Sequence, residues 1–328
     1  MAQTNVKVSI IVPIHNTLKY FSKCLDSLTL QTLNETEIIV VDDASTENVK
    51  EFLDNYPRKG NISYIRNEKS LGPGGARNIG LKYATGKYVG FCDSDDWVDI
   101  TYYETAYNAM ESTHSDIGMT GLLRKYDTPL EQDIYKCRYS QLICLDSDAA
   151  FQILTYQRDM GIKVIPPCTN KIYRKSFLTE NQLTFEPNVY FQDDLFSVKC
   201  ITKTEHIVCI PNVLYYHYKR PDSIIQSFSE KHIEDYYFVF SEIKSYLIAV
   251  KKYDRYEFGY FRFAEHFYNL IVRQIFEFSK DEDSRKKYLI SSFKSVKKLI
   301  DFKKYFKYLS SEEIRNHIQP YIKDTSIN

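Results

Sequence analysis

The segment Val8-Ser9-Ile10-Ile11-Val12-Pro13-Ile14-His15-Asn16 decides the fold of this chain. Its first five residues are almost all β-branched or apolar, which is typical of a strand buried on both faces. Pro13 ends this run, and Asn16 is a residue that can cap a following helix. That helix is indicated by apolar residues at helical spacing, namely Phe21, Cys24, Leu25 and Leu28. The segment therefore predicts a strand followed directly by a helix.

Three further strands are predicted at residues 37–41, 61–66 and 87–92, with helical segments between them. Strands that alternate with helices indicate an α/β fold with a mostly parallel sheet and right-handed crossovers. Polar residues follow three of the four strands, at positions 15–16, 42–43 and 93–96. Ligands of open α/β sheets bind beyond the carboxyl ends of the strands, so we expect the functional site there.

The pattern changes twice along the chain. It is less regular from about residue 100 to 225, and beyond residue 226 it becomes helical and rich in Tyr, Phe and Lys. A chain of 328 residues is long enough for one large domain and a smaller one. We therefore predict a catalytic domain over residues 1–225 and a helical C-terminal domain over residues 226–328.

Composition narrows the class of protein. The 43 basic residues equal the 43 acidic ones, so net charge gives no sign of a nucleic-acid partner. Seven cysteines without a CxxC pair favour a reducing compartment. We found neither a signal peptide nor an apolar run of about 18 residues, and therefore expect a cytoplasmic protein, with peripheral contact to the membrane left open.

The sequence Phe91-Cys92-Asp93-Ser94-Asp95-Asp96 is the strongest chemical feature. Carboxylates at positions i and i+2 beyond a strand point in the same direction. Two such groups can hold a hard divalent ion while leaving ligand positions for a diphosphate. Viewed alone, the same acids also fit a solvated turn that caps a helix.

Asp42 and Arg77 are candidates for contact with a nucleotide. Asp42 can accept a hydrogen bond from a nucleobase, although a helix cap is the simpler interpretation. Arg77 follows Gly72-Pro73-Gly74-Gly75 in the first turn of a predicted helix, where a cation is unfavourable unless an anion faces it. The glycine segment matches neither a P-loop nor a Rossmann fingerprint.

Two later segments add candidates. Asp193 and Asp194 lie between large apolar residues, so one of them is either a general base or a helix cap. His217, Arg220 and Ser223 follow a short predicted strand and can meet a phosphate or a metal, although a histidine among tyrosines is more often a packed core residue.

Together these pieces resemble the inverting family 2 glycosyltransferases of GT-A fold, in the bacterial branch that builds cell-surface polysaccharides. The resemblance covers residues 6–225 and rests on segments that occur in the family's order: 8–16, 40–46, 72–80, 86–96, 170–176, 192–196 and 215–223.

The resemblance implies a role for each candidate. A nucleotide-sugar donor, usually a UDP-sugar, would bind at Pro13, His15, Asn16, Asp42, Arg77, Asp93, Ser94, Arg220 and Ser223. A Mn²⁺ or Mg²⁺ ion would bind at Asp93, Asp95 and His217. Asp193 would be the catalytic base. The family commonly has Glu where this chain has Gln192, so the choice between Asp193 and Asp194 stays open.

The predicted activity is metal-dependent transfer of a hexosyl or N-acetylhexosaminyl group, with inversion, to a hydroxyl of a glycan, lipid-linked or polymer acceptor. The alternatives are a sugar-nucleotide nucleotidyltransferase and a non-catalytic glycan-binding relative. The identity of the sugar, the acceptor and the oligomeric state are not predicted.

Residues 285–307 carry nine basic residues and one acid around apolar positions at helical spacing. Such a helix can rest on an anionic membrane or meet a polyanionic acceptor. The simpler interpretation is a helix packed on the catalytic domain with a solvated lysine face.

Overall fold

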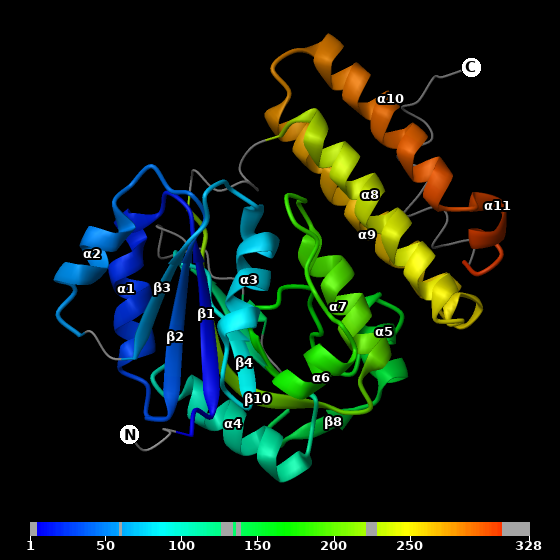
Figure 1. Ribbon diagram of the computed structural model, residues 1–328. Helices are drawn as coiled ribbons and strands as arrows, with labels where there is room; N and C mark the ends of the chain where they lie inside the picture. The colour runs from blue at the N-terminus through cyan, green and yellow to red at the C-terminus, as the bar shows by residue number, and fades with distance from the viewer. Residues whose placement is uncertain (1–4, 59–60, 126–133, 136–138, 221–227, 310–328) are drawn as a thin grey trace. The chain divides into compact units, whose positions relative to one another are not determined.

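The computed structural model describes residues 5–58, 61–125, 134–135, 139–220 and 228–309 (Figure 1). Its contacts divide the chain into two compact units, Met1–Gln226 and Ser227–Asn328. The first unit is an α/β structure built on one large sheet, and the second is helical. The predicted α/β fold with a helical C-terminal region is confirmed.

The first half of the sheet is entirely parallel and has the order β3-β2-β1-β4. Its strands are β1 (Val8–Ile14), β2 (Thr36–Asp42), β3 (Ile62–Arg66) and β4 (Tyr88–Phe91). They are connected by α1 (Leu18–Thr29), α2 (Val49–Asn55) and α3 (Gly72–Tyr83). Every residue of β1 is buried, as its β-branched sequence predicts for a central strand covered on both faces.

Helices cover both faces of β1 (Figure 1). Val8, Ile10 and Val12 belong to the same apolar cluster as the buried residues of α1. On the other face α3 packs so closely that a Cβ on Gly80 would lie 2.4 Å from Cγ2 of Ile11. The period of two residues along β1 thus sends alternate side chains to opposite helices.

The second half of the sheet is mixed and continues in the order β9-β6-β10-β5. Its strands are β5 (Trp97–Val98), β6 (Ile117–Lys125), β9 (Lys171–Arg174) and β10 (Ile207–Tyr218), with β7 (Ile134–Tyr135) and β8 (Ile143–Leu145) off this path. The helices are α4 (Tyr102–Thr113), α5 (Ser147–Leu154), α6 (Lys175–Glu180) and α7 (Gln192–Lys203).

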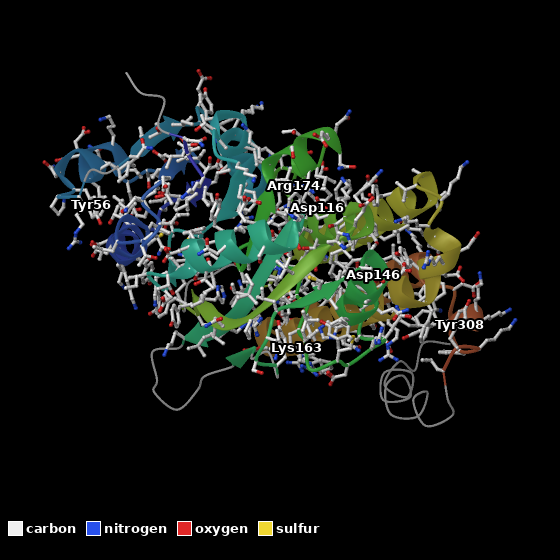
Figure 2. All side chains as sticks on the ribbon, turned by 90° about the horizontal axis from the view of Figure 1, so that it is seen from below. Tyr56, Asp116, Asp146, Lys163, Arg174 and Tyr308 are labelled. Atoms are coloured by element: carbon white, nitrogen blue, oxygen red, sulfur yellow. The ribbon has the colours of Figure 1, made fainter. Side chains whose placement is uncertain are left out.

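One antiparallel strand sets where the site can form. β9 is antiparallel to both β4 and β6, and β10 is parallel to β6, so β10 runs in the same direction as β1. The carboxyl end of β10 therefore lies at the same edge of the sheet as the ends of β1, β2 and β4. An ion pair between Arg174 and Asp116, which lie side by side in Figure 2, fastens β9 to the start of β6.

The helical unit contains α8 (Glu230–Ala249), α9 (Tyr253–Phe278), α10 (Glu282–Leu299) and α11 (Phe302–Tyr305). Its core is aromatic, and two buried tyrosine hydroxyls donate to carbonyls of the facing helix: Tyr236 to Ala264 at 2.8 Å and Tyr260 to Phe240 at 3.1 Å. α10 packs on α8 and α9 through Val296 and Leu299. None of the helices in the described part of the chain combines the length and the apolar character needed to cross a membrane.

The contact between α3 and β1 yields a stability prediction. Gly80→Ala places a methyl group against Ile11, and overpacking of this kind costs about 1–3 kcal/mol of the free energy of unfolding. Chemical denaturation should show this loss. The double variant Gly80→Ala/Ile11→Ala removes both γ carbons of Ile11, which the new methyl group would meet, and should lose less than the sum of the two single variants. Strict additivity would contradict the proposed contact.

Candidate functional site

The loops after β1 and β2 are tied together by Asn16. Its backbone is left-handed, with φ of 53°, and its Oδ1 accepts hydrogen bonds from Thr46 N at 2.8 Å and Thr46 Oγ1 at 3.0 Å. The prediction that Asn16 caps α1 is therefore wrong, because its side-chain oxygen is used by the β2 loop. Glu47 takes over that task, accepting a hydrogen bond from Leu18 N at 2.9 Å.

Pro13 and His15 occupy the same end of β1. Pro13 is buried within the strand, whereas His15 is exposed and its Nδ1 lies 2.7 Å from the carbonyl oxygen of Asp43. An exposed imidazole and the loop joined by Asn16 thus stand at the carboxyl edge of the sheet, where a ligand of an α/β sheet is expected.

Asp42 ends β2 fully buried and is engaged by its neighbours. Ser45 N donates to its Oδ1 at 2.8 Å, and Tyr64 donates to its Oδ2 at 2.8 Å, where Arg66 also binds. Burial alone would raise the pKa of Asp42, but these hydrogen bonds and the Arg66 charge outweigh burial and lower the pKa. A nucleobase bound at Asp42 would therefore have to share a carboxylate oxygen that already accepts a hydrogen bond.

Asp43 is a polar residue that the sequence analysis left without a role. Its carboxylate, 2% exposed, accepts hydrogen bonds from Asn67 Nδ2 at 2.8 Å, Ser70 Oγ at 2.7 Å and Leu71 N at 2.9 Å. It therefore shapes the turn that enters α3 at Gly72, where φ is 68°. The only signal in the sequence was its position directly after a buried strand.

Two acids in the loop after β4 contact arginine side chains. Asp93 Oδ1 accepts a hydrogen bond from Arg77 Nη2 at 2.6 Å, and Asp95 Oδ2 lies 2.7 Å from Arg220 Nε. Ser94 is buried and its hydroxyl pairs with Thr17 Oγ1 at 2.8 Å. Burial and the neighbouring Asp96 and Asp93 raise the pKa of Asp95 to about 7. An acid in that environment favours a nearby positive charge, whether an arginine or a metal ion.

Asp96 is the second residue that the sequence analysis did not assign. It is 1% exposed and accepts hydrogen bonds from Tyr215 Oη at 2.6 Å and Tyr218 N at 2.8 Å. Nδ1 of His217 lies 3.2 Å from Asp96 Oδ2. Burial alone would lower the pKa of His217, but the Asp96 charge outweighs it and the pKa is raised.

Arg77 lies between two of the predicted acids. Its side chain is 2% exposed and contacts Asp93 at 2.6 Å and, through Nη1, Asp193 Oδ1 at 3.5 Å. The guanidinium also lies over the ring of Phe185, 5.4 Å from the ring centroid. Nε and Nη1 have no hydrogen-bond partner in the described part of the chain. Buried donors are usually satisfied, so these two indicate a site that a ligand completes.

The first turn of α7 separates the two candidate bases. The Asp193 side chain is 24% exposed, whereas Asp194 is buried and its pKa is raised well above the usual range by burial and by the Asp193 charge. Burial therefore disfavours the charged form of Asp194, whereas Asp193 is the more accessible of the two acids. Gln192 Oε1 and one oxygen of each aspartate also lack a hydrogen-bond partner among the described residues.

The structure thus brings three groups together: Arg77 with Asp93 and Asp193, Asp95 with Arg220, and Asp96 with His217. Asp42 has its own partners on β3. Ser223 lies outside the described residues. Within the described ranges, no three His, Cys, Asp or Glu side chains come close enough to form a metal site by themselves.

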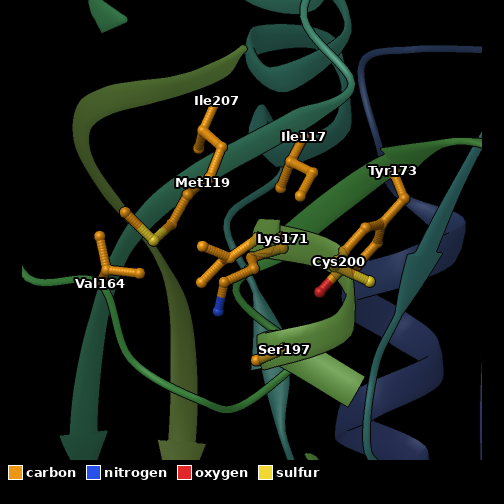
Figure 3. Close-up of a pocket in the computed structure, with 9 residues that line it drawn as sticks. Ile117, Met119, Val164, Lys171, Tyr173, Ser197, Cys200 and Ile207 are labelled. Atoms are coloured by element: carbon orange, nitrogen blue, oxygen red, sulfur yellow. The ribbon is translucent and has the colours of Figure 1, made fainter. Parts of the chain in front are cut away.

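The small cavity in Figure 3 is not part of this site. It has a volume of about 10 Å³ and is lined mainly by apolar side chains and Lys171. The Lys171 ammonium donates to the carbonyls of Ile165 at 2.6 Å and Pro167 at 2.5 Å and to Asn170 Oδ1 at 3.1 Å. Burial lowers the pKa of Lys171 to about 8, but its ammonium group is already bound by two backbone carbonyls and the side-chain oxygen of Asn170. The space suits at most about one water molecule.

A parallel half-sheet, an acid cluster after β4 and a separate acid at the start of α7 define the GT-A class of glycosyltransferase. The chain belongs to Glycosyl transferase family 2, whose sequence profile matches residues 9–181.

Similar proteins agree with this assignment. The chain is 28% identical to the poly(ribitol-phosphate) beta-glucosyltransferase of Bacillus spizizenii, over 97% of this chain and 47% of that protein. It is also 28% identical to the poly(ribitol-phosphate) beta-N-acetylglucosaminyltransferase TarS of Staphylococcus aureus, over 71% of this chain and 39% of that protein. The chain thus spans less than half the length of these relatives.

The fold comparison gives the same result. The crystal structure of S. aureus TarS 1–349 matches with a TM-score of 0.66 at 22% identity, over 90% of this chain and 83% of that one. The complex of the same protein with UDP-GlcNAc matches with a TM-score of 0.60 at 21% identity, over 89% of each chain. At this level of identity the match establishes the GT-A fold, which confirms the predicted fold class.

The buried arginine gives a second prediction. Arg77→Met leaves Asp93 and Asp193 without their shared cation, so the free energy of unfolding at pH 7 should fall by about 1–3 kcal/mol, less than for a fully buried pair because both acids are partly exposed. Chemical denaturation at pH 7 measures the loss.

Arg58→Met is the matched control, because Arg58 pairs with Asp26 at the surface, where its side chain is 50% exposed. It should change stability by less than about 1 kcal/mol. Equal losses in Arg77→Met and Arg58→Met would contradict a special contribution of the buried arginine to stability.

Proposed function

We propose that this chain transfers a sugar from a UDP-sugar to a hydroxyl of a cell-surface glycopolymer, with inversion at the anomeric carbon. The observation that carries the proposal is the buried Arg77, which contacts the DxD acid Asp93 at 2.6 Å and Asp193 of α7 at 3.5 Å. A donor-binding acid and a candidate base thereby face one cation, although they are a hundred residues apart in the sequence.

The proposed donor site lies at the carboxyl ends of β1, β2 and β4. Its residues are Pro13, His15, Asn16, Asp42, Arg77, Asp93, Ser94, Arg220 and Ser223, to which the structure leads us to add Asp43. The loops there are joined by Asn16 and Asp43, which provides a fixed surface for the nucleotide. The complex of TarS with UDP-GlcNAc supports a uridine nucleotide as donor.

We further propose a divalent ion, Mn²⁺ or Mg²⁺, held by Asp93, Asp95 and His217. Two carboxylates and an imidazole suit such an ion chemically. Each of the two acids contacts an arginine through one of its carboxylate oxygens. When bound, the ion would neutralise charge on the departing diphosphate. Arg220, next to Asp95, adds a fixed positive charge at the same place.

Asp193 is the proposed base. It takes the proton of the acceptor hydroxyl as that oxygen attacks the anomeric carbon from the face opposite the diphosphate. A single displacement inverts the anomeric centre and requires no covalent enzyme intermediate. Arg77 Nη1 lies 3.5 Å from Asp193 Oδ1 and helps to hold that carboxyl group in place. Asp194 is only 3% exposed, which makes it the less accessible of the two acids.

The third prediction tests this mechanism. Asp193→Asn should lower kcat by about 10²–10⁴-fold and leave the affinity for the UDP-sugar within a few-fold, because the base acts only in the transition state. A panel of UDP-sugars with and without Mn²⁺, followed by release of UDP and titration of binding, gives both values.

Asp194→Asn is the control and should keep most of the activity, since the Asp194 side chain is buried and the substitution keeps its size. Wild-type protein that binds and consumes no sugar nucleotide would contradict the proposed function, and a fully active Asp193→Asn variant would remove Asp193 from the mechanism.

We also propose that the helical unit contacts an anionic acceptor. Over residues 227–309 the sequence has 17 Lys and Arg against 12 Asp and Glu. α10 exposes five lysines, Lys286, Lys287, Lys294, Lys297 and Lys298. Val296 and Leu299 of α10 are buried, and the helix packs on α8 and α9. The relatives that act on poly(ribitol-phosphate), a polyanion, support a polymer partner.

The fourth prediction concerns this lysine face. Replacing Lys286, Lys294 and Lys297 with Glu should weaken binding to a polyol-phosphate polymer at least tenfold and reduce the salt dependence of binding. The control replaces three exposed lysines of the first unit, Lys50, Lys82 and Lys203, and should bind normally. Equal losses in both variants, or binding only to anionic lipid vesicles, would contradict a polymer-binding face.

A further inference from the structure

We propose that Lys171 is a positioning residue for the acceptor side of sugar transfer. Its buried ammonium holds the loop of residues 165–168 against the face of α7 that carries Asp193, and this loop forms one wall of the space in which an acceptor hydroxyl meets the base. The inference rests on the proposed function, in which Asp193 is the base. Lys171 itself touches no reacting group, and its effect is exerted through the loop.

Lys171 is the first residue of β9, and its side chain binds the loop that precedes the strand. The residue is 3% exposed. Nζ donates to the carbonyls of Ile165 at 2.6 Å and Pro167 at 2.5 Å and to Asn170 Oδ1 at 3.1 Å. An ammonium has three N–H donors, so all three are used, and all three acceptors are uncharged oxygens. Burying a charge against uncharged partners is costly, which favours a role beyond packing.

The two prolines of the loop make it depend on bonds of this kind. Pro166 and Pro167 have no N–H, so neither can donate to a neighbouring strand. Side chains bind their carbonyls instead: Lys171 binds that of Pro167, and Ser197 Oγ of α7 donates to that of Pro166 at 2.5 Å. Lys171 and Ser197 also line the same small cavity (Figure 3). The loop is therefore fastened between β9 and α7 by two side chains.

The same loop lies beside the proposed base. Asp193 and Ser197 are four residues apart in α7, so they share one face of the helix. Cys168 is fully buried, and the pKa of its thiol is raised by burial and further by the charge of Asp193, which lies close by. Pro166 and Pro167 are half-buried, whereas the side chain of Asp193 is 24% exposed. An acceptor that approaches Asp193 therefore has this loop along one side.

A wall of this kind affects one reaction more than the others. A misplacement of about 1 Å can lower the rate of a positioned reaction by about 100-fold. Water needs no wall to reach the anomeric carbon, so slow hydrolysis of the donor should not depend on the loop. Donor binding at the ends of β1, β2 and β4 should not depend on it either. A purely structural role of Lys171 would instead lower all three activities together.

The experiment compares transfer with hydrolysis in full-length Lys171→Met, which keeps most of the length of the side chain and removes its donors. With a UDP-sugar that the wild-type protein consumes and a polyol-phosphate polymer as acceptor, kcat/KM for the polymer should fall by about 10–100-fold. The affinity for the UDP-sugar and its hydrolysis without polymer should stay within about threefold. Hydrogen exchange should become faster in residues 162–170.

Lys175→Met is the matched control. Lys175 also donates to a backbone carbonyl, that of Ala84, but it does so from the other end of β9. Transfer to the polymer should therefore stay within about twofold of the wild-type value in this variant.

Ser197→Ala tests the other attachment of the loop. It removes one hydroxyl, leaves Lys171 intact, and should lower kcat/KM for the polymer by about 3–10-fold with donor binding unchanged. Because both side chains act through the same loop, Lys171→Met/Ser197→Ala should lose less than the product of the two single losses. This smaller change also keeps the test decisive where Lys171→Met does not fold.

Four results would overturn the proposal: full transfer to the polymer in folded Lys171→Met or in Ser197→Ala, equal losses of donor binding, hydrolysis and transfer, fully multiplicative losses in the double variant, or unchanged hydrogen exchange in residues 162–170 of Lys171→Met. The last result does not depend on activity. Wild-type protein that consumes no UDP-sugar would instead contradict the proposed function, and hydrogen exchange would still show whether the ammonium holds the loop.

Discussion

The site depends on a guanidinium buried between two carboxylates. Arg77 can lose its hydration only because Asp93 and Asp193 supply charge on either side of it, and neither acid is close to it in sequence. Removing either acid would leave a buried cation undercompensated. The proposed donor and acceptor sides of the reaction are thus linked by one electrostatic requirement of the folded state.

This arrangement is possible because of the sheet topology. A parallel α/β half alone places the ends of β1, β2 and β4 at one edge. Because β9 is antiparallel to β4 and β6, β10 also ends at that edge. The last residues of β10 contact the acid cluster. Asp96, which follows β4, accepts a hydrogen bond from Tyr215 of β10, and this bond holds the two segments together. The functional loops are therefore extensions of strands whose positions the core fixes.

Local structure could be predicted well from the sequence, whereas contacts between residues distant in sequence could not. The β-branched runs predicted β1 and β2, because burial on both faces leaves a pattern in the strand itself. The parallel half of the sheet and the end positions of the acids followed from that. The partners of Asp43 and Asp96 could not be predicted, since they come from residues 67–71 and 215–218, and nothing in either segment specifies the other. Asn16 was misassigned for the same reason: its side chain serves a loop 30 residues away in sequence.

Charge balance indicates how a donor could enter without disturbing this network. Arg77 and Arg220 already compensate Asp93, Asp95 and Asp193 in the protein without ligand. The diphosphate of a nucleotide sugar carries about two negative charges, and a divalent ion brings two positive ones. The proposed donor–ion pair would therefore add almost no net charge and would leave the arginines with their acids. An anion arriving alone would instead compete with the acids for both arginines. The charges of the site thus fit the proposed pair of donor and ion better than an anion alone.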